Sequence, residues 1–248
     1  QKINAERIRS ELDQGRIVIV AGFQGTDENG EIYTLGRGAS DTTAVALAAV
    51  LKADRCEIYT DVDGVYSADP RIVPNARKIE LVSYDEMLEL ASQGAKVMHS
   101  RAIEFGKKYN VIIHVRSSFT DNTGTFITHE VKQMEHIVVS GAAVKKNLAQ
   151  FILHGLPNHP GVASHIFAQL AQHKVVVDDI VQTIDDEGFA YVGFTVEHGD
   201  LTECKMVVEE IRKQYGLTKI VCYDPIAKVS VVGAVSYTHL TLPTNREV

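Results

Sequence analysis

Short apolar runs alternate with longer mixed segments along the first half of the chain. Residues 16–22 form a run of isoleucine and valine that ends in glycine, and residues 56–59 and 111–115 are two further apolar runs. Such runs are typical of buried strands in a parallel sheet that is covered on both faces. Residues 42–51 are rich in alanine, with valine and leucine, and predict a packed helix. The pattern therefore predicts an α/β domain.

Local capping signals mark two more helices in this half. Ser83 followed by Glu86 is a Ser-x-x-Glu capping box, which predicts a helix over residues 84–92 that is ended by Gly94. A second stretch of helical character covers residues 100–109.

The second half repeats the alternation in a different order. After residues 128–135, where the composition becomes charged and polar, we expect a domain boundary. The elements that follow alternate as β-α-β-β-α-β, which is the ferredoxin-like arrangement. They are predicted over residues 151–155, 162–173, 175–183, 189–198, 201–215 and 219–223. A further strand is expected to begin at Lys228. Fold alone does not give function.

Composition narrows the class of partner. The chain has 248 residues, is 45% hydrophobic and 23% charged, and carries a formal net charge of -7. These values are ordinary for one large or two modest globular domains, and two is our expectation. The absence of a basic stripe argues against nucleic acid or an anionic membrane as partner. Three scattered cysteines predict neither disulfides nor a cysteine metal site, which fits a reducing cytoplasm.

The candidate chemistry begins with an acidic turn over residues 59–71. Thr60 and Asp61 stand at the carboxyl end of a predicted strand, where open α/β sheets bind ligands. Asp63 and Asp69 follow, and Arg71 supplies a guanidinium suited to phosphate oxygens. An ordinary solvated turn is the alternative.

A glycine-rich loop over residues 36–41 opens the helix predicted at residue 42. Free backbone N–H groups at such a helix start favour an anion, and Ser40 or Asp41 is expected to cap the helix. The loop is neither a Gly-x-Gly-x-x-Gly motif, since Asp41 replaces the third glycine, nor a P-loop. A tight turn with a capping serine is the plainer reading.

Two further positions carry alternatives. Lys96 stands at the junction between two helices, where it is either solvated or a point charge for phosphate. The loop of residues 156–161 precedes a helix and could receive a small anionic or zwitterionic ligand, or it is a plain Pro-Gly turn.

Several motifs, in order, resemble the aspartate kinases of the amino-acid kinase superfamily. They are Thr-Leu-Gly-Arg-Gly-Ala-Ser-Asp at 34–41, the turn at 59–71, Gly-Ala-Lys-Val-Met-His at 94–99 and Val-Arg-Ser-Ser at 115–118. The resemblance covers residues 16–234 and implies a partial, carbamate kinase-like three-layer α/β domain followed by a ferredoxin-like βαββαβ ACT domain. It implies transfer of a phosphoryl group from ATP, with Mg²⁺, to the side-chain carboxylate of L-aspartate.

The resemblance also assigns roles to individual residues, and it implies no metal-ligating side chain. Lys96 and Asp61 would be catalytic. The residues implied to bind aspartate are Phe23, Arg37, Gly38, Ala39, Ser40 and Asp41. Those implied to bind ATP are Thr60, Asp61, Tyr66, Ser67, Ala68, Asp69, Pro70, Arg71, Lys96 and Val97. A regulatory amino acid, threonine or lysine, would contact Asn158, Ala163, Asp178 and Gln182.

The chain departs from the family pattern at both ends. The Lys-Phe-Gly-Gly phosphate-binding motif of these kinases is absent. We therefore expect an internal fragment that is inactive and poorly soluble alone. Its expected parts are a nucleotide-binding part (1–129), a first ACT domain (130–227), a truncated second one (228–234) and a non-native tail (235–248).

Several wider questions stay open from the sequence. The chain could instead be a non-catalytic, amino-acid-sensing module. Less favoured are a kinase for another acidic amino acid and one fused to homoserine dehydrogenase. The ACT domains are expected to mediate homo- or hetero-oligomers.

Overall fold

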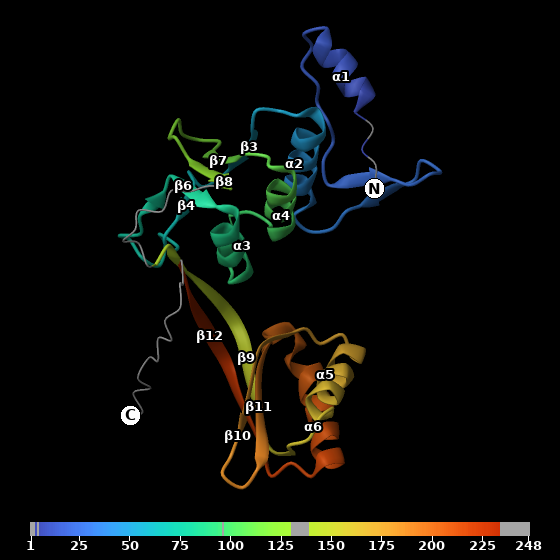
Figure 1. Ribbon diagram of the computed structural model, residues 1–248, viewed down its shortest axis with the longest axis vertical. Helices are drawn as coiled ribbons and strands as arrows, with labels where there is room; N and C mark the ends of the chain where they lie inside the picture. Colours follow the sequence, from blue (N-terminus) through green and yellow to red (C-terminus); the bar gives the residue numbers. More distant parts are fainter. Residues whose placement is uncertain (1–2, 4, 96, 130–138, 234–248) are drawn as a thin grey trace. The chain divides into compact units, whose positions relative to one another are not determined.

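The structure, a computed structural model, describes residues 3, 5–95, 97–129 and 139–233 of the chain (Figure 1). Contacts divide it into two compact units. The first consists of Gln1–Val144 with Ser230–Val248, and the second of Lys145–Val229. Among the described residues, no helix has the length and apolar character that crossing a bilayer requires.

The first unit contains a four-stranded sheet and four helices among its described residues. The sheet has the order β3-β7-β8-β6, in which β3 and β7 are parallel and β7 and β8 antiparallel. The helices are α1 (Glu6–Asp13), α2 (Ala39–Leu51), α3 (Tyr84–Ser92) and α4 (Ser100–Tyr109). The strands are β1 (Gln24–Thr26), β2 (Ile32–Thr34), β3 (Cys56–Thr60), β4 (Val65–Tyr66), β5 (Lys78–Ile79), β6 (Leu81–Ser83), β7 (Ile113–Ser117) and β8 (Thr125–Thr128).

The core of this unit lies between the helices and the sheet. Helices α2 and α4 run side by side (Figure 1), and their buried alanines, such as Ala48 and Ala102, let the two backbones approach closely. Ile103 of α4, Ile113 of β7 and Ile127 of β8 are fully buried and belong to one apolar cluster. Burial of this kind is the main favourable term in folding, so it fixes the position of both helices.

Local signals predicted three helices of this unit correctly. The capping box is present, since Ser83 Oγ accepts from the Glu86 N–H at 3.2 Å while the Glu86 carboxylate accepts from the Ser83 N–H at 3.2 Å. The predicted bounds 84–92 and 100–109 agree with α3 and α4. The predicted helix over 42–51 is α2, which begins three residues earlier.

The predicted buried strand over residues 16–22 is wrong. These residues form no strand, and Ile17 and Ile19 are 95% and 94% exposed. An apolar composition makes a strand possible, but a strand forms only where a neighbouring strand accepts and donates its backbone hydrogen bonds. Among the described strands, none pairs with residues 16–22.

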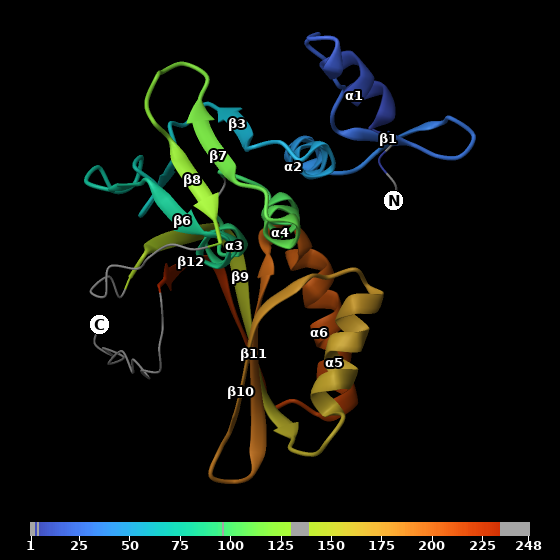
Figure 2. The same cartoon turned by 45° about the horizontal axis from the view of Figure 1, so that its top comes forward.

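The second unit has the predicted β-α-β-β-α-β order. Its strands are β9 (Gly141–Pro157), β10 (Val177–Ile184), β11 (Phe189–Glu197) and β12 (Lys219–Val232), arranged as β10-β11-β9-β12. Helices α5 (Val162–Gln172) and α6 (Leu201–Tyr215), the latter preceded by the short helix η1 (His198–Asp200), cover one face of this sheet (Figure 2). Phe151, Phe194 and Ile166 are fully buried between helices and strands. The predicted ferredoxin-like fold is therefore confirmed.

Strand limits differ from the predictions because pairing, and not composition, decides where strands begin and end. The expected separate strand at Lys228 is the last part of β12, which runs unbroken from Lys219. The expected tail over residues 235–248 lies outside the described residues, as does most of the expected boundary at 128–135. The division into domains at those positions stays a prediction.

The capping box of α3 generates a stability test. We expect Ser83→Ala to lower the free energy of unfolding of the chain by about 1 kcal/mol, because the Glu86 N–H loses its acceptor. Urea denaturation measures the difference. Ser92→Ala, at the other end of the same helix, is the control and should change stability by less than about 0.5 kcal/mol. Equal losses for the two variants would contradict the capping role.

Candidate functional site

Two glycines with left-handed backbone shape the loop that leads into α2. Gly36 has φ 88° and Gly38 has φ 72°, a region that glycine enters without the strain a side chain brings. Gly38 is the N-cap residue of α2, and no side chain caps this helix. The predicted cap by Ser40 or Asp41 is therefore wrong. The left-handed turn at Gly38 starts the helix at Ala39, so both residues lie inside its first turn.

Arg37 stands between these two glycines and is exposed. No hydrogen bond or ion pair joins it to another of the described residues. Ala39 is buried beneath the loop, whereas Ser40 is exposed. The arrangement presents one guanidinium next to the start of a 13-residue helix, and both features favour an anion.

The start of α4 lies against this loop. The His99 N–H donates to Asp41 Oδ2 at 3.3 Å, and Arg101 Nη1 donates to the Leu35 carbonyl at 3.3 Å. Phe23 belongs to the same group, because its carbonyl accepts from the Leu35 N–H at 3.0 Å. The predicted aspartate-binding residues are thus brought next to the segment that follows Val97, which is partly buried. Lys96 lies outside the described residues.

The carboxyl ends of β3 and β7 lie next to each other, as their parallel register pairs Thr60 with Ser117. Both the N–H and the hydroxyl of Ser118 donate to the Thr60 carbonyl, at 2.9 and 3.0 Å. The Thr60 hydroxyl in turn donates to Asp61 Oδ1 at 3.0 Å, and Asp61 is exposed. Thr60 and Asp61 therefore stand at the strand end where the sequence predicted them.

The acidic turn that follows is held by its own side chains. Asp63 accepts from the Tyr66 hydroxyl at 2.7 Å and from Asn122 Nδ2 at 2.8 Å. The hydrogen bond from Tyr66 is the main reason that the pKa of Asp63 lies below its usual value. The same bond raises the pKa of Tyr66. The Tyr66 hydroxyl is therefore already engaged within the turn.

Asp69 and Arg71 form a bidentate pair at the far end of this turn. Arg71 Nε donates to Asp69 Oδ1 at 3.0 Å and Nη2 to Oδ2 at 2.9 Å. Ser67 anchors the turn, since its N–H donates to the Arg77 carbonyl at 2.8 Å. Ala68 and Pro70 lie between these anchors. In the described part of the chain, no three histidine, cysteine or acidic side chains gather closely enough to hold a metal ion.

That the turn of residues 61–71 and the loop of residues 36–41 face one cleft stays a prediction.

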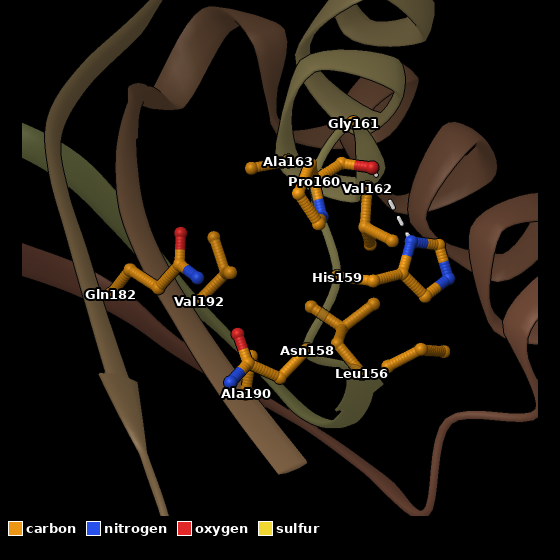
Figure 3. A pocket seen from close by; sticks show the side chains of 11 residues that line it. Leu156, Asn158, His159, Pro160, Gly161, Val162, Ala163, Gln182, Ala190 and Val192 are labelled. Carbon is orange, nitrogen blue, oxygen red and sulfur yellow. Dashed lines mark hydrogen bonds between the residues drawn. The ribbon is translucent and has the colours of Figure 1, made fainter. Parts of the chain in front are cut away.

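The second unit contains a pocket of about 330 Å³ at the start of α5 (Figure 3). Asn158, Ala163 and Gln182, all predicted to contact a regulatory amino acid, line it together. Gly161, with φ 98°, caps α5 at its edge. Figure 3 shows the amides of Gln182 and Asn158 on different sides of the hollow, below the first turn of α5. The remaining lining residues are Leu156, Pro157, His159, Pro160, Val162, Ala190 and Val192.

Asp178, predicted for the same role, does not line this pocket. Its Oδ2 pairs with Lys228 Nζ at 3.2 Å and with Lys145 Nζ at 3.5 Å. Burial alone would raise the pKa of Asp178, but the hydrogen bond and charge of Lys228 outweigh it and lower the pKa. This carboxylate is thus neutralised within the unit.

The sequence reasoning missed the residues that support these sites. His99 was part of a quoted motif, but no signal assigned it to the loop around Gly38. Asn122 and Thr125 lie more than 50 positions after the acidic turn, yet Asn122 bonds Asp63 and Thr125 Oγ1 accepts from the Val65 N–H at 2.8 Å. Only tertiary pairing of distant segments shows such partners.

Comparison with known proteins finds amino acid kinases that are similar to this chain. The profile of the amino acid kinase family matches residues 1–117. An aspartate kinase of Pseudomonas putida is 46% identical over 239 residues, which covers 96% of this chain and 58% of that protein. An aspartokinase of a Bacillus species is 48% identical over 232 residues, or 94% of this chain and 56% of that protein. The chain thus spans a little more than half the length of these relatives.

Two solved structures share the fold. Escherichia coli aspartokinase III, in complex with lysine and aspartate, matches with a TM-score of 0.76 and 28% identity over 92% of this chain and 51% of that one. Clostridium acetobutylicum aspartate kinase matches with a TM-score of 0.75 and 32% identity over 86% of this chain and 49% of that one. The predicted fold class is confirmed.

The lowered pKa of Asp63 generates a test of pH dependence. A carboxyl group with a lowered pKa stabilises the folded state above its ordinary value of 3.8, and this contribution is lost as pH falls through the folded pKa. We expect Asp63→Asn to lower the Tm of the chain most at pH 6–7, and the difference from wild type to narrow below about pH 4. Thermal unfolding between about pH 3 and 7 measures it.

The control for this series is Asp121→Asn, an exposed carboxyl in the neighbouring loop. A difference in Tm between wild type and Asp63→Asn that is the same at every pH would exclude a contribution from ionised Asp63.

Proposed function

The chain belongs to the aspartate kinase family, and on that premise we propose that the protein transfers the γ-phosphoryl group of ATP to the side-chain carboxylate of L-aspartate. The product would be 4-phosphoaspartate, an intermediate on the way to lysine, threonine and methionine. The single observation that carries the proposal is Arg37, an exposed guanidinium without a partner among the described residues, between two left-handed glycines at the start of α2.

The acceptor needs to be held rather than activated. A side-chain carboxylate with an ordinary pKa near 4 is already ionised at neutral pH, so no general base is required. Arg37 can grip one carboxylate of aspartate in a bidentate manner, since the guanidinium matches carboxylate geometry. The first turn of α2 offers the backbone N–H of Ser40 and the positive end of the helix dipole to the same anion, whereas the Ala39 N–H already donates to the Gly36 carbonyl at 3.2 Å. Asp41 Oδ1 is the group best suited to the ammonium of the amino acid, since Oδ2 accepts from His99.

The nucleotide would occupy the carboxyl end of β3. We assign Thr60, Asp61, the turn of residues 66–71, Lys96 and Val97 to this subsite. The Arg71 guanidinium uses Nε and Nη2 for Asp69, so its remaining N–H groups are available to a phosphate oxygen. Lys96 would place a point charge on the phosphates.

The chemistry that remains is charge neutralisation in a loose transition state. Mg²⁺, when bound with ATP, would supply positive charge that neutralises the charge developing on the phosphates. No cage of three ligating side chains occurs in the described residues, which suits an ion held by phosphates and one or two carboxylates. Asp61, exposed at the end of β3, is the first carboxylate of the segment that we assign to the nucleotide.

We assign regulation to the pocket at the start of α5. A free amino acid fits its chemistry, because the α5 N-terminus favours a carboxylate and the amides of Asn158 and Gln182 can donate and accept hydrogen bonds. The E. coli relative was crystallised with lysine and aspartate, which supports an amino acid as regulator. Threonine and lysine are the two candidates. Assembly of subunits through the ferredoxin-like units accompanies this proposal.

Steady-state kinetics of the full-length enzyme test the acceptor site. We expect Arg37→Ala to raise the KM for aspartate roughly 10- to 100-fold, the equivalent of the 1.5–3 kcal/mol of a charged hydrogen bond. The KM of Arg37→Lys for aspartate should lie between those of wild type and Arg37→Ala, because lysine keeps the positive charge but cannot make the bidentate contact of a guanidinium. Arg7→Ala on α1 is the control. An unchanged aspartate KM in Arg37→Ala would remove Arg37 from the acceptor site.

Lys96→Ala should instead weaken the binding of ATP more than the binding of aspartate.

A hydroxylamine trap for the acyl phosphate separates the kinase from a non-catalytic sensor. Hydroxamate formed from aspartate and ATP by the full-length protein supports the kinase. Thermal stabilisation by threonine or lysine without any hydroxamate would support the sensor.

Feedback control is tested at Gln182. We expect Gln182→Ala to raise the concentration of threonine or lysine needed for half-inhibition at least about 10-fold, because a pocket hydrogen bond is lost, and to leave uninhibited kcat within about twofold. Gln172→Ala, an exposed glutamine at the end of helix α5 and outside the pocket lining, is the matched control. Equal inhibition of both variants would exclude the pocket as the regulatory site.

A further inference from the structure

The imidazole of His99 occupies the space beside Gly38 that the side chain of any other residue would need. A Cβ placed on Gly38 would come within 2.2 to 2.4 Å of Cγ, Cδ2 and Cβ of His99. No two non-bonded carbon atoms approach that closely, so His99 packs directly against Gly38 and leaves no room for a side chain at position 38. The left-handed turn of Gly38, with φ 72°, therefore packs against the side chain of the N-cap residue of α4.

Two hydrogen bonds fix His99 itself. Its Nδ1 accepts from the Arg101 N–H at 3.3 Å, which makes His99 the N-cap residue of α4. Its own N–H donates to Asp41 Oδ2 at 3.3 Å, in the first turn of α2. The imidazole is thus oriented by α4, whereas the backbone of His99 is attached to α2. The starts of the two helices are joined at one residue.

Arg101 holds the other side of the same loop. Its Nη1 donates to the Leu35 carbonyl at 3.3 Å and lies 4.0 Å from the point where a Cβ on Gly36 would stand. Leu35 is in turn bonded through its N–H to the Phe23 carbonyl. The two glycines that flank Arg37 are therefore each bordered by one side chain from the start of α4.

We propose that His99 and Arg101 are positioning residues of the acceptor site: they fix the loop of residues 36–41, and through it the direction of the Arg37 guanidinium. Neither residue touches the acceptor. The inference rests on the proposed function in that it takes this loop to hold the acceptor carboxylate. Because α4 directly follows Lys96 and Val97 in the chain, the same contacts connect the acceptor loop with the segment assigned to the nucleotide.

Kinetics of the full-length enzyme test this role with variants that separate capping from contact. His99→Asn keeps an N-cap acceptor for α4 and removes the ring beside Gly38. We expect His99→Asn and Arg101→Ala each to raise the KM for aspartate about 10-fold or more, as expected for the loss of one charged hydrogen bond from Arg37. The KM for ATP should stay within about threefold. Lys108→Ala, which removes a positive charge from the exposed end of the same helix, should change neither value.

A double-mutant cycle shows whether His99 acts through Arg37. In the Arg37→Ala background, His99→Asn should add less than about threefold to the aspartate KM, since the guanidinium that it directs is already gone. Full additivity of the two changes would overturn the proposal. So would a lower Tm of His99→Asn with both KM values unchanged, which is the result expected of ordinary helix packing.

Hydrogen exchange tests the same inference independently of activity. We expect the peptide that covers residues 35–42 to exchange faster in His99→Asn and in Arg101→Ala than in wild type, and not in Lys108→Ala. Unchanged exchange in both variants would overturn the positioning role even if the protein is a kinase. Faster exchange in a protein that forms no hydroxamate from aspartate would leave the positioning of the loop intact and remove the proposed acceptor.

Discussion

The parallel pairing of β3 with β7 is the constraint on which the first unit depends. Its register places Thr60 beside Ser117, and Ser118 closes the strand ends with two hydrogen bonds to the Thr60 carbonyl. Helices α2 and α4 each lead directly into one of these strands, so pairing the strands also brings the two helices side by side. The candidate chemistry then follows from where these four elements begin and end.

The start of each helix in this unit has a different physical basis, and the difference bears on function. Helix α3 is capped by Ser83 and Glu86 within its own sequence. Helix α2 has no side-chain cap, and its N-cap residue Gly38 packs against His99, the N-cap residue of α4. A helix start without its own cap keeps backbone N–H groups for other partners. That property suits α2 to an anionic ligand and leaves α3 a structural element.

In the second unit, the paired charges of Asp178, Asp179 and Lys228 lie outside the pocket lining. Asp178 and Asp179 are paired with Lys228, whereas the pocket at the start of α5 is lined by two amides, His159 and apolar residues, with no acidic side chain and no lysine or arginine. A carboxylate that two lysines already neutralise adds little attraction for a cation. The pocket therefore offers hydrogen bonds and a helix start, and its selectivity depends on shape and amide orientation more than on charge.

The features of this protein that depend only on a short stretch of sequence were predictable from the sequence. The capping box at Ser83, the helix over residues 100–109 and the order of elements in the second unit were all predicted from local sequence. Only the tertiary structure decided the rest, because strands and loop supports need partners from distant segments. Residues 16–22 have the composition of a strand and no pairing partner among the described residues, while the side chain that packs against Gly38 belongs to His99, 61 positions further along the chain.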